Sequence, residues 1–550
     1  MAGALCGLTS AASAAAPQRD WGTYLPGTVG WLDVAYAVVV DAEGNAFVAG
    51  GTYSTAGIAT PGAPRTTAEG GEGFLMKFAP DGALLWGTYI GGSGDDGVYE
   101  LALAGDTLLL TGGSDSPGLA TVGAFDTTDP TPMKPVRFVR AIKTDGQLLW
   151  STYLRVGGAV PAIDRTSGAM YVAGSVNATV PGLTNADSHQ QYAHTTGQEC
   201  DGFLARLDDK GQLVWGTYYG GKTYTDDQVF AIVADAGDVY IAGGTESSSG
   251  IATPGTHKDT LSQTHRDAFL ARFTADGQRV WGTYFGNDFG FDLAQALVQL
   301  PGGDLVLAGW TDSELEIATP GALQDSFAGD TDAFLARFTP AGQRVWGTYY
   351  GGPGYDSGAR LATTPQGQIY FSIFTDSDGL AAADGLQTAN NGNNDLLLAK
   401  FDPDGARRWA TYYGGAGKEF YHAVAASGAD ALFLVGGTSS PDGIATPGAL
   451  DTSFEGELVD QPDAFVVRFS QGLGAACDGA CATGFCVDGV CCESECGGGA
   501  DDCQACAVAL GAAQDGACTP LGPDVVCRPG DACDPADDTE KPMLADGTVI

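Results

Sequence analysis

Acidic side chains recur at one position of a repeated pattern in this chain, and they are the first candidates for chemistry. Each stands ten to twelve residues after a tryptophan, where a strand is expected to begin. They are Asp33, Asp96, Asp227, Asp292, Asp356 and Glu419, and the third copy of the pattern has Val160 instead. Carboxylate oxygens that converge from several strands could bind a hard cation such as calcium. The alternative is structural, since a buried carboxylate also accepts hydrogen bonds from a neighbouring element.

Four of the five histidines form a second candidate site. His189 and His194 fall in one predicted loop, and His257 and His265 fall in the corresponding loop of the next copy. Imidazole groups from adjacent loops could converge on zinc or copper. Their spacing matches no ligand signature, so the competing interpretation is that they are ordinary solvated loop residues.

Cysteines are concentrated near the end of the chain, which predicts a disulfide framework. The eleven are Cys477, Cys481, Cys486, Cys491, Cys492, Cys496, Cys503, Cys506, Cys518, Cys527 and Cys533. No histidine falls among them, which argues against a zinc ribbon. Because eleven is odd, Cys200 either bridges to this segment or stays a free thiol. Disulfides require an oxidising compartment, so we expect a secreted or cell-surface protein.

The first 16 residues agree with this localisation. They are small and mildly apolar and end in Ala14-Ala15-Ala16, which suits a signal peptide, although a positively charged start is missing. The formal charge of −41 would repel nucleic acid and anionic membranes alike. No apolar stretch is long enough for a transmembrane helix. We therefore expect no nucleic-acid partner and no membrane span.

A tryptophan, a small residue and Thr-Tyr recur at intervals of 63 to 66 residues, and this period predicts the fold. The copies begin at Trp21, Trp86, Trp150, Trp215, Trp281, Trp346 and Trp409. One period predicts four strands, near 293–299, 305–310, 333–338 and 343–350. Asp267, Asp332 and Asp463 open the third strand of their copies, where we expect them to cap it locally.

The two ends of the repeat predict a closed ring. The last copy has three strands and no fourth, whereas the first begins with an unaccompanied Trp21-Gly22-Thr23-Tyr24 strand. If that strand completes the last copy, no sheet edge stays exposed. We therefore predict an all-β protein with a seven-bladed β-propeller over residues 20–472. A cysteine-rich module would follow over residues 473–535, and residues 536–550 would be a disordered tail.

The motifs WGTYYGG, DAEGNAFVAGGT, GDVYIAGGT and DAFLARF resemble the bacterial SBBP-type β-propeller repeat over about four-fifths of the chain. That resemblance implies seven blades but says little about activity, because one propeller fold carries many functions. GFCVDGVCC and CQAC in the tail look like the cysteine-rich modules of surface proteins from myxobacteria and their relatives.

The long, variable loops of such a propeller share one face, where binding residues are usually found. No nucleophile elbow, zinc-protease helix, phosphate loop or dinucleotide fingerprint occurs in the sequence. We therefore expect a monomeric binding or adhesion scaffold that is not an enzyme, with no cofactor except possible calcium. Its partner would be an unknown protein or glycan at the long-loop face. An extracellular metal-dependent lyase or hydrolase and an architectural surface-layer component are the alternatives.

Overall fold

The computed structural model describes two parts of the chain. The first is residues 17–471, with gaps at 28–31, 132–134, 196, 222–224, 262–264, 288, 384, 393, 429–430 and 457–461. The second is a set of short segments at 485–487, 490–492, 504–505, 519–520, 525–526 and 543–544.

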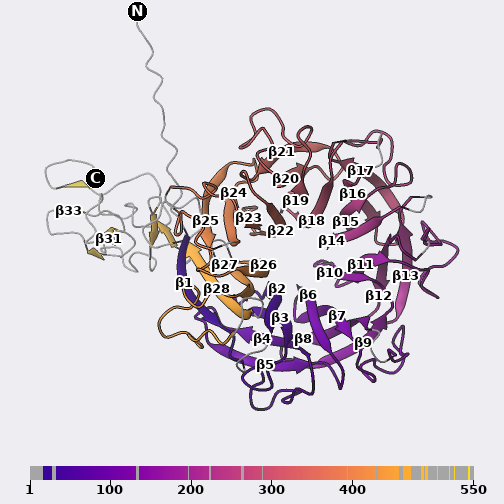
Figure 1. The fold of residues 1–550 in the computed structure, drawn as a ribbon, viewed down its shortest axis with the longest axis horizontal. Coiled ribbons are helices and arrows are strands. Elements are labelled where there is room, and N and C mark those ends of the chain that lie inside the picture. The colour runs from indigo at the N-terminus through magenta and orange to yellow at the C-terminus, as the bar shows by residue number, and fades with distance from the viewer. Residues whose placement is uncertain are drawn as a thin grey trace, which may run out of the picture.

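Residues 17–471 form seven four-stranded antiparallel sheets arranged as blades around a central axis (Figure 1). The innermost strands are β2 (Asp33–Val40), β6 (Asp96–Ala104), β10 (Gly158–Ile163), β14 (Asp227–Asp235), β18 (Asp292–Gln299), β22 (Asp356–Thr363) and β26 (Glu419–Ser427). The second strands are β3 (Ala46–Thr52), β7 (Thr107–Ser114), β11 (Met170–Val176), β15 (Asp238–Thr245), β19 (Leu305–Thr311), β23 (Ile369–Thr375) and β27 (Ala431–Thr438).

In the outer half of each blade, the third strand pairs with the outermost strand. The third strands are β4 (Glu72–Phe78), β8 (Val136–Lys143), β12 (Asp201–Leu207), β16 (Asp267–Thr274), β20 (Asp332–Phe338), β24 (Asp395–Phe401) and β28 (Asp463–Gln471). The outermost strands are β5 (Leu84–Ile90), β9 (Leu148–Leu154), β13 (Leu213–Tyr219), β17 (Arg279–Phe285), β21 (Arg344–Tyr350), β25 (Arg407–Tyr413) and β1 (Pro17–Tyr24). The predicted strand ranges of the fifth blade agree with these bounds to within a residue.

The ring closes as the sequence predicts. β1 pairs antiparallel with β28, so Tyr24 stands opposite Phe465, and the seventh blade has the order β26, β27, β28 and β1. β1 begins at Pro17, three residues before the predicted start of the propeller. The described segments after residue 484 form three two-stranded pairs: β29 (Phe485–Val487) with β30 (Val490–Cys492), β31 (Gln504–Ala505) with β32 (Thr519–Pro520), and β33 (Val525–Val526) with β34 (Met543–Leu544).

Tryptophan, tyrosine and isoleucine side chains of the repeat join neighbouring blades. In four blades the indole Nε1 donates to a carbonyl in the third-to-fourth-strand turn of the following blade, for example Trp281 to Pro340 at 3.0 Å. Ile251 and Ile317 of the Ile-Ala-Thr-Pro-Gly segments are fully buried. The carbonyl of Ile251 accepts from the hydroxyl of Tyr219 in the preceding blade at 2.9 Å. These residues therefore hold neighbouring blades of the ring together.

Candidate functional site

The six predicted acidic residues are buried at the start of the innermost strands, where hydroxyl groups of their own blade bind them. Asp292 illustrates the arrangement. Its Oδ1 accepts from Thr311 Oγ1 at 2.5 Å, and its Oδ2 accepts from Ser313 Oγ at 2.8 Å and from the N–H of Asn287 at 3.0 Å. We call this set of hydroxyls and acid a hydroxyl clamp. The other clamp hydroxyls are Thr52 and Ser54, Ser114 and Ser116, Thr245 and Ser247, Thr375 and Ser377, and Thr438 and Ser440.

A second acidic residue, which opens the third strand, faces the clamp acid of the next blade across the blade junction. The six junction acid pairs are Glu72 and Asp96, Asp201 and Asp227, Asp267 and Asp292, Asp332 and Asp356, Asp395 and Glu419, and Asp463 and Asp33. All these third-strand acids are buried. The structure therefore distributes the predicted ring of carboxylates over six separate junctions. Sequence reasoning found Asp267, Asp332 and Asp463 only as local caps and missed Glu72, Asp201 and Asp395.

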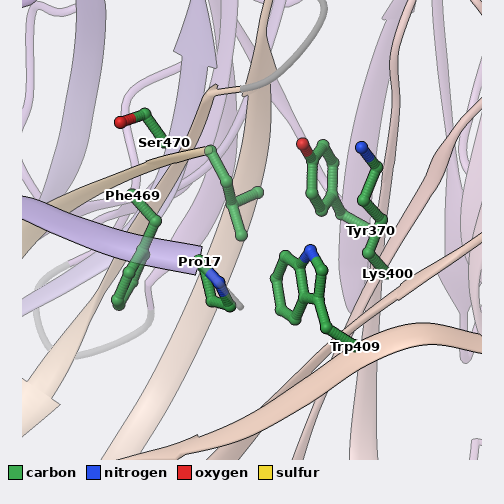
Figure 2. Close-up of a pocket in the computed structure, with 7 residues that line it drawn as sticks. Pro17, Tyr370, Lys400, Trp409, Phe469 and Ser470 are labelled. Carbon is green, nitrogen blue, oxygen red and sulfur yellow. The ribbon is translucent and has the colours of Figure 1, made fainter. Parts of the chain in front are cut away.

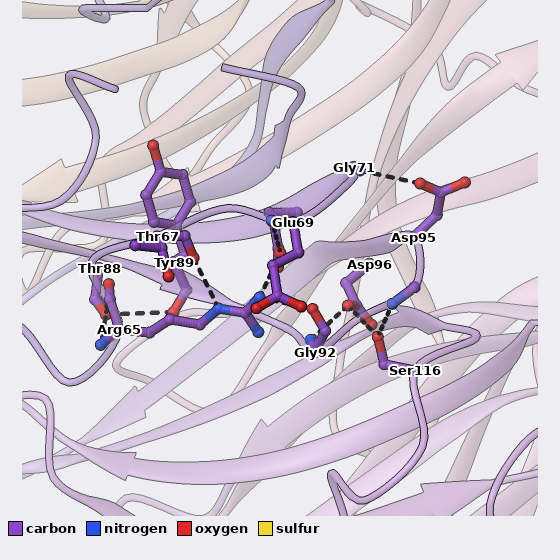
Figure 3. Close-up of polar contacts among 12 residues, drawn as sticks. Arg65, Thr67, Glu69, Gly71, Thr88, Tyr89, Gly92, Asp95, Asp96 and Ser116 are labelled. Atoms are coloured by element: carbon purple, nitrogen blue, oxygen red, sulfur yellow. Dashed lines mark hydrogen bonds and ion pairs between the residues drawn. The ribbon is translucent and has the colours of Figure 1, made fainter. Parts of the chain in front are cut away.

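Burial raises the pKa values of these pairs, because a carboxylate loses its hydration inside the protein. The pKa of Asp292 rises to about 7, chiefly through burial and further through the facing carboxylate of Asp267. Burial and the facing Asp395 raise the pKa of Glu419 to about 8. Among the described residues, a lysine or arginine side chain forms an ion pair with the third-strand acid at two junctions. Arg65 Nη2 lies 2.6 Å from Glu72 Oε1 (Figure 3), and Lys258 Nζ lies 2.9 Å from Asp267 Oδ2.

The junction between the second and third blades differs in every one of these features. Val136 opens the third strand, and Val176 and Ala178 stand where other blades carry the clamp hydroxyls. The strand register also corrects which residue of the third blade stands at the position of the clamp acid. Val160 pairs with Ala173, and the residue that comes opposite Val176 is Gly157, whose N–H donates to the carbonyl of Ser175 at 2.7 Å. The two acids and the hydroxyls are therefore absent together.

A β-bulge or similar irregularity accompanies the clamp acid in six blades. It turns one residue of the innermost strand out of the pairing in five blades and two residues, Gly358 and Ala359, in the sixth blade. The bulged residues include Tyr36, Tyr99, Phe230 and Tyr421. The ring of Tyr36 lies 5.5 Å from that of Tyr99 and 5.1 Å from that of Tyr421, both edge-on. Because these three residues come from three different innermost strands, they line the central channel beside the long-loop face. Tyr421 is 58% exposed and has a φ of 40°.

Further exposed aromatic rings lie on the loops of the same face. Phe289, Phe291 and Tyr355 precede β18 and β22, and they are 80%, 44% and 50% exposed. Tyr53 follows β3 and is 40% exposed. Together with Tyr99, Phe230 and Tyr421 they form what we call the aromatic rim. Clustered exposed aromatics mark binding surfaces more often than isolated ones do. Sequence reasoning missed the rim, although an aromatic residue two or three positions after the clamp acid could have indicated its bulged members.

The four predicted metal-binding histidines have separate surroundings. His189 packs against Phe273 and Tyr219, and burial lowers its pKa to about 4. His257 packs in the same way in the next blade, between Phe285 and Phe338, and burial again lowers the pKa to about 4. These two imidazoles therefore pack between neighbouring blades as apolar side chains do.

The other two histidines have polar or aromatic neighbours of their own. His194 Nδ1 lies 3.2 Å from Gln190 Nε2, and His265 stands edge-on to Phe291 with ring centres 5.6 Å apart. Within the described ranges, no group of three or more His, Cys, Asp or Glu side chains is arranged to hold a metal ion.

The predicted disulfides fall largely outside the described residues. Cys486 pairs through its backbone with Cys491 in β29 and β30, and Cys492 ends β30; the other eight tail cysteines are not described. The half-buried thiol of Cys200 forms no disulfide with any described residue, and burial raises its pKa. No helix in the part of the chain that the structure describes is long and apolar enough to cross a membrane.

A small hollow lies on the opposite, short-turn face, between the sixth and seventh blades (Figure 2). Pro17, Tyr370, Lys400, Trp409, Leu432, Phe469 and Ser470 line it. Its space is about 230 Å³, open solvent included, which is below the usual volume of a ligand pocket. The aromatic rim is therefore the better candidate for ligand binding.

Comparisons with known proteins show no family. No family model matches the chain, so membership of the SBBP repeat family remains a prediction. The Regulatory protein FlaEY of Caulobacter vibrioides is 25% identical over 248 residues, which are 45% of this chain and 22% of that protein. A protein of unknown function from Dyadobacter fermentans is 10% identical, covers 83% of this chain and 99% of its own, and has a TM-score of 0.39. The endosialidase of phage phi92 is 11% identical, covers 82% and 70%, and has a TM-score of 0.37.

Proposed function

We propose that this protein is a secreted or cell-surface binding scaffold that holds a glycan at the aromatic rim. The observation that carries the proposal is the gathering of exposed Tyr and Phe rings around one end of the channel. Flat aromatic rings stack on the apolar C–H faces of sugars, while tyrosine hydroxyls bond to sugar hydroxyls. The net charge of −41 disfavours acidic polysaccharides. The ligand class is therefore a neutral glycan, and adhesion is its expected use.

The test is binding of the full chain to an array of neutral and acidic polysaccharides. Tyr421→Ala and Phe291→Ala should each weaken binding at least tenfold, because each removes one stacking surface. Val214→Ala is the matched control, since Val214 is also exposed, at 48%, but lies on the outer strand β13. Equal binding by all four proteins, or binding of acidic polysaccharides alone, would contradict the proposal.

Two alternatives remain as outcomes of the same experiment. A metal-dependent lyase or hydrolase would release new sugar ends from a bound polysaccharide, and chelator would stop that release. A purely architectural component would bind none of the polysaccharides. Membership of the SBBP repeat family and export through the predicted signal peptide are further parts of this proposal. Mass spectrometry of the secreted protein would detect cleavage after Ala16.

A further inference from the structure

Two blades depart from the repeat at one register position of the innermost strand. The second blade has Glu100 opposite Thr111 of its second strand, and the sixth blade has Arg360 opposite Ser372. In the other five blades both partners are small and apolar: Ala37 and Ala49, Val160 and Ala173, Ala231 and Ala242, Ala296 and Ala308, and Ala423 and Val435. The fold therefore does not require polar groups at this position, and burying them costs free energy. Two such departures, one acidic and one basic, indicate a role other than stability.

Neither charged side chain is satisfied by the rest of the chain. Glu100 is half-buried and forms no hydrogen bond or ion pair with any described residue. Arg360 is also half-buried, and among the described residues it donates only through Nη1, to the carbonyl of Ala359 at 3.1 Å. Ser372 Oγ is buried and has no hydrogen-bond partner in the described part of the chain. Polar groups left unmatched inside a protein are completed by water or by a ligand.

Both charged side chains belong to the central channel. Glu100 directly follows the bulged Tyr99 on β6, and Arg360 lies on β22, on the other side of the channel (Figure 1). Burial raises the pKa of Glu100, and the charge of Arg360 opposes this rise, although the two strands belong to the second and sixth blades. The innermost strands begin at the long-loop face, so Glu100 lies one residue deeper than Tyr99. The channel therefore has aromatic rings at its entrance and two opposite charges below them.

The other titratable neighbour of Arg360 is uncharged. His422 of the seventh blade is buried, and burial together with the charge of Arg360 lowers its pKa to about 3. The imidazole is therefore neutral at physiological pH and supplies no counter-charge to the guanidinium. Within the described residues, the opposite charge that acts on Arg360 from the channel is that of Glu100.

This combination of groups fits the hydroxyls of a sugar. A carboxylate only accepts hydrogen bonds and a guanidinium only donates them, whereas a hydroxyl does both. One negative and one positive charge together favour a ligand without net charge, in agreement with a neutral glycan. A polysaccharide that lay across the long-loop face would reach the aromatic rim but not the deeper charges. Because seven blades enclose the channel, only the end of a sugar chain can enter it.

We propose that Glu100 and Arg360 bind the terminal sugar of a neutral glycan, which enters the channel past Tyr99 and Tyr421. This inference rests on the proposed function and adds to it the part of the glycan that is recognised. The aromatic rim stacks on the sugars that follow, and the two charged side chains select a free chain end.

The first test counts the protein molecules that bind to one polysaccharide chain. The probe is the linear neutral polysaccharide that binds best in the array, cut by acid into short and long fragments. Calorimetric titration should give one protein molecule per chain for both lengths, because each chain has one end of the recognised kind. A number that increases with chain length would overturn this inference and leave the glycan-binding function intact.

The second test gives the two blades the residues that the other blades have. The variants are Glu100→Ala and the double variant Arg360→Ala with Ser372→Ala. Thr111 is kept, because its Oγ1 donates to the carbonyl of Ala159 at 2.8 Å. Each variant should bind the short fragment about tenfold more weakly, since it loses a hydrogen bond to a charged group. Each should melt at the same temperature as the original protein or higher, because an unmatched polar group is removed from the interior.

A matched control and a structural alternative complete the experiment. Glu43→Gln removes an exposed carboxylate from a turn on the opposite face, so it should bind the fragment as the original protein does. If Glu100→Ala and the double variant melt lower yet bind the fragment unchanged, the two charges form only an internal ion pair bridged by water, and the inference is overturned. If the original protein binds no polysaccharide of the array, the proposed function is overturned and this inference with it.

Discussion

Six junctions of the ring contain a buried acid pair held by hydroxyls, whereas the junction between the second and third blades contains neither acids nor clamp hydroxyls. The difference extends to the tyrosine of the outermost strand. Tyr284 OH donates to the carbonyl of the clamp residue Ser247 at 2.7 Å in a clamped blade, whereas in the third blade Tyr218 OH donates to the carbonyl of Val180 at 3.4 Å. The third blade also lacks the β-bulge and therefore the channel-lining residue. Clamp, acid pair and bulge thus behave as one unit that a blade has entirely or not at all.

The comparison also explains why a ring can tolerate one apolar junction. A buried acid is costly unless its hydrogen bonds are made, and a buried hydroxyl is costly without an acceptor. Losing one member alone leaves the others unsatisfied, while replacing all of them with apolar groups avoids the penalty. Stability alone therefore does not explain why six of the junctions contain this unit. Its consequence for function is the bulge, which turns a tyrosine or phenylalanine towards the channel in four blades.

The largest expected effect comes from removing one acid from a complete clamp. Asp292→Ala leaves the hydroxyls of Thr311 and Ser313 and the N–H of Asn287 without their acceptor. We expect the free energy of unfolding to fall by about 3 kcal/mol. Chemical denaturation of the variant and of the triple variant with Thr311→Val and Ser313→Ala measures this. The triple variant should lose less than the sum of the single losses, because the three side chains act together. Simple additivity would show that the clamp is not a unit.

A threonine introduced into the apolar junction should destabilise the protein. Val176 is 1% exposed, and the innermost strand beside it has no carboxylate to receive a hydroxyl; its partner on β12 is Asp201, whose Oδ2 already accepts from Gln190 and from the N–H of His194. We therefore expect Val176→Thr to cost about 2 kcal/mol, although the two side chains have nearly the same shape. Thr311→Val, the reverse exchange in a clamped blade, should also be destabilising. If Val176→Thr were as stable as the original protein, the apolar junction would not depend on the joint absence of polar groups.

The acid pairs should make the protein less stable as the pH rises. The pKa of Asp292 is about 7 in the folded protein and that of Asp463 is about 6, against an ordinary value of 3.8 in the unfolded chain. The folded state thus binds more protons, so the stabilisation is complete below about pH 4 and is lost as the pH approaches 7. Each group contributes at most about 1.4 kcal/mol per pH unit.

Denaturation in chelator between pH 5 and pH 8 tests this direction. Asp292→Asn should show a shallower fall than the original protein, because asparagine does not titrate. A free energy of unfolding that stays flat or increases over this range would contradict the raised pKa values of the buried junction acids.

The sequence predicted the ring well and the site poorly, for physical reasons. The Trp-Thr-Tyr period and the unaccompanied strand at Trp21 depend on local pattern and on the need to close a sheet edge, so they predict seven blades directly. The junction pairs could not be predicted, because Asp395 and Glu419 belong to different blades and only the ring geometry brings them together. His189 and His257 suggested a metal, but their aromatic neighbours come from the third strand of the following blade as well as from their own outermost strand. Val160 was misplaced because the connection before the third blade is short: two residues, 155 and 156, separate β9 from Gly157, whereas five residues, 91–95, separate β5 from Asp96.

The smallest expected effect tests whether the bulge serves binding rather than stability. Tyr421 has a φ of 40°, a conformation that costs a non-glycine residue about 1 kcal/mol or more. Tyr421→Gly removes that strain while losing one edge-on contact with Tyr36, so its stability should change by less than about 1 kcal/mol. Tyr421→Ala keeps the strain and loses the contact, so it should be less stable than the glycine variant. Calorimetric melting compares the two. Glycine normally destabilises a strand. If the alanine variant melts at a higher temperature than the glycine variant, the backbone at residue 421 is unstrained. The protein then does not lose stability by holding the Tyr421 ring in this position.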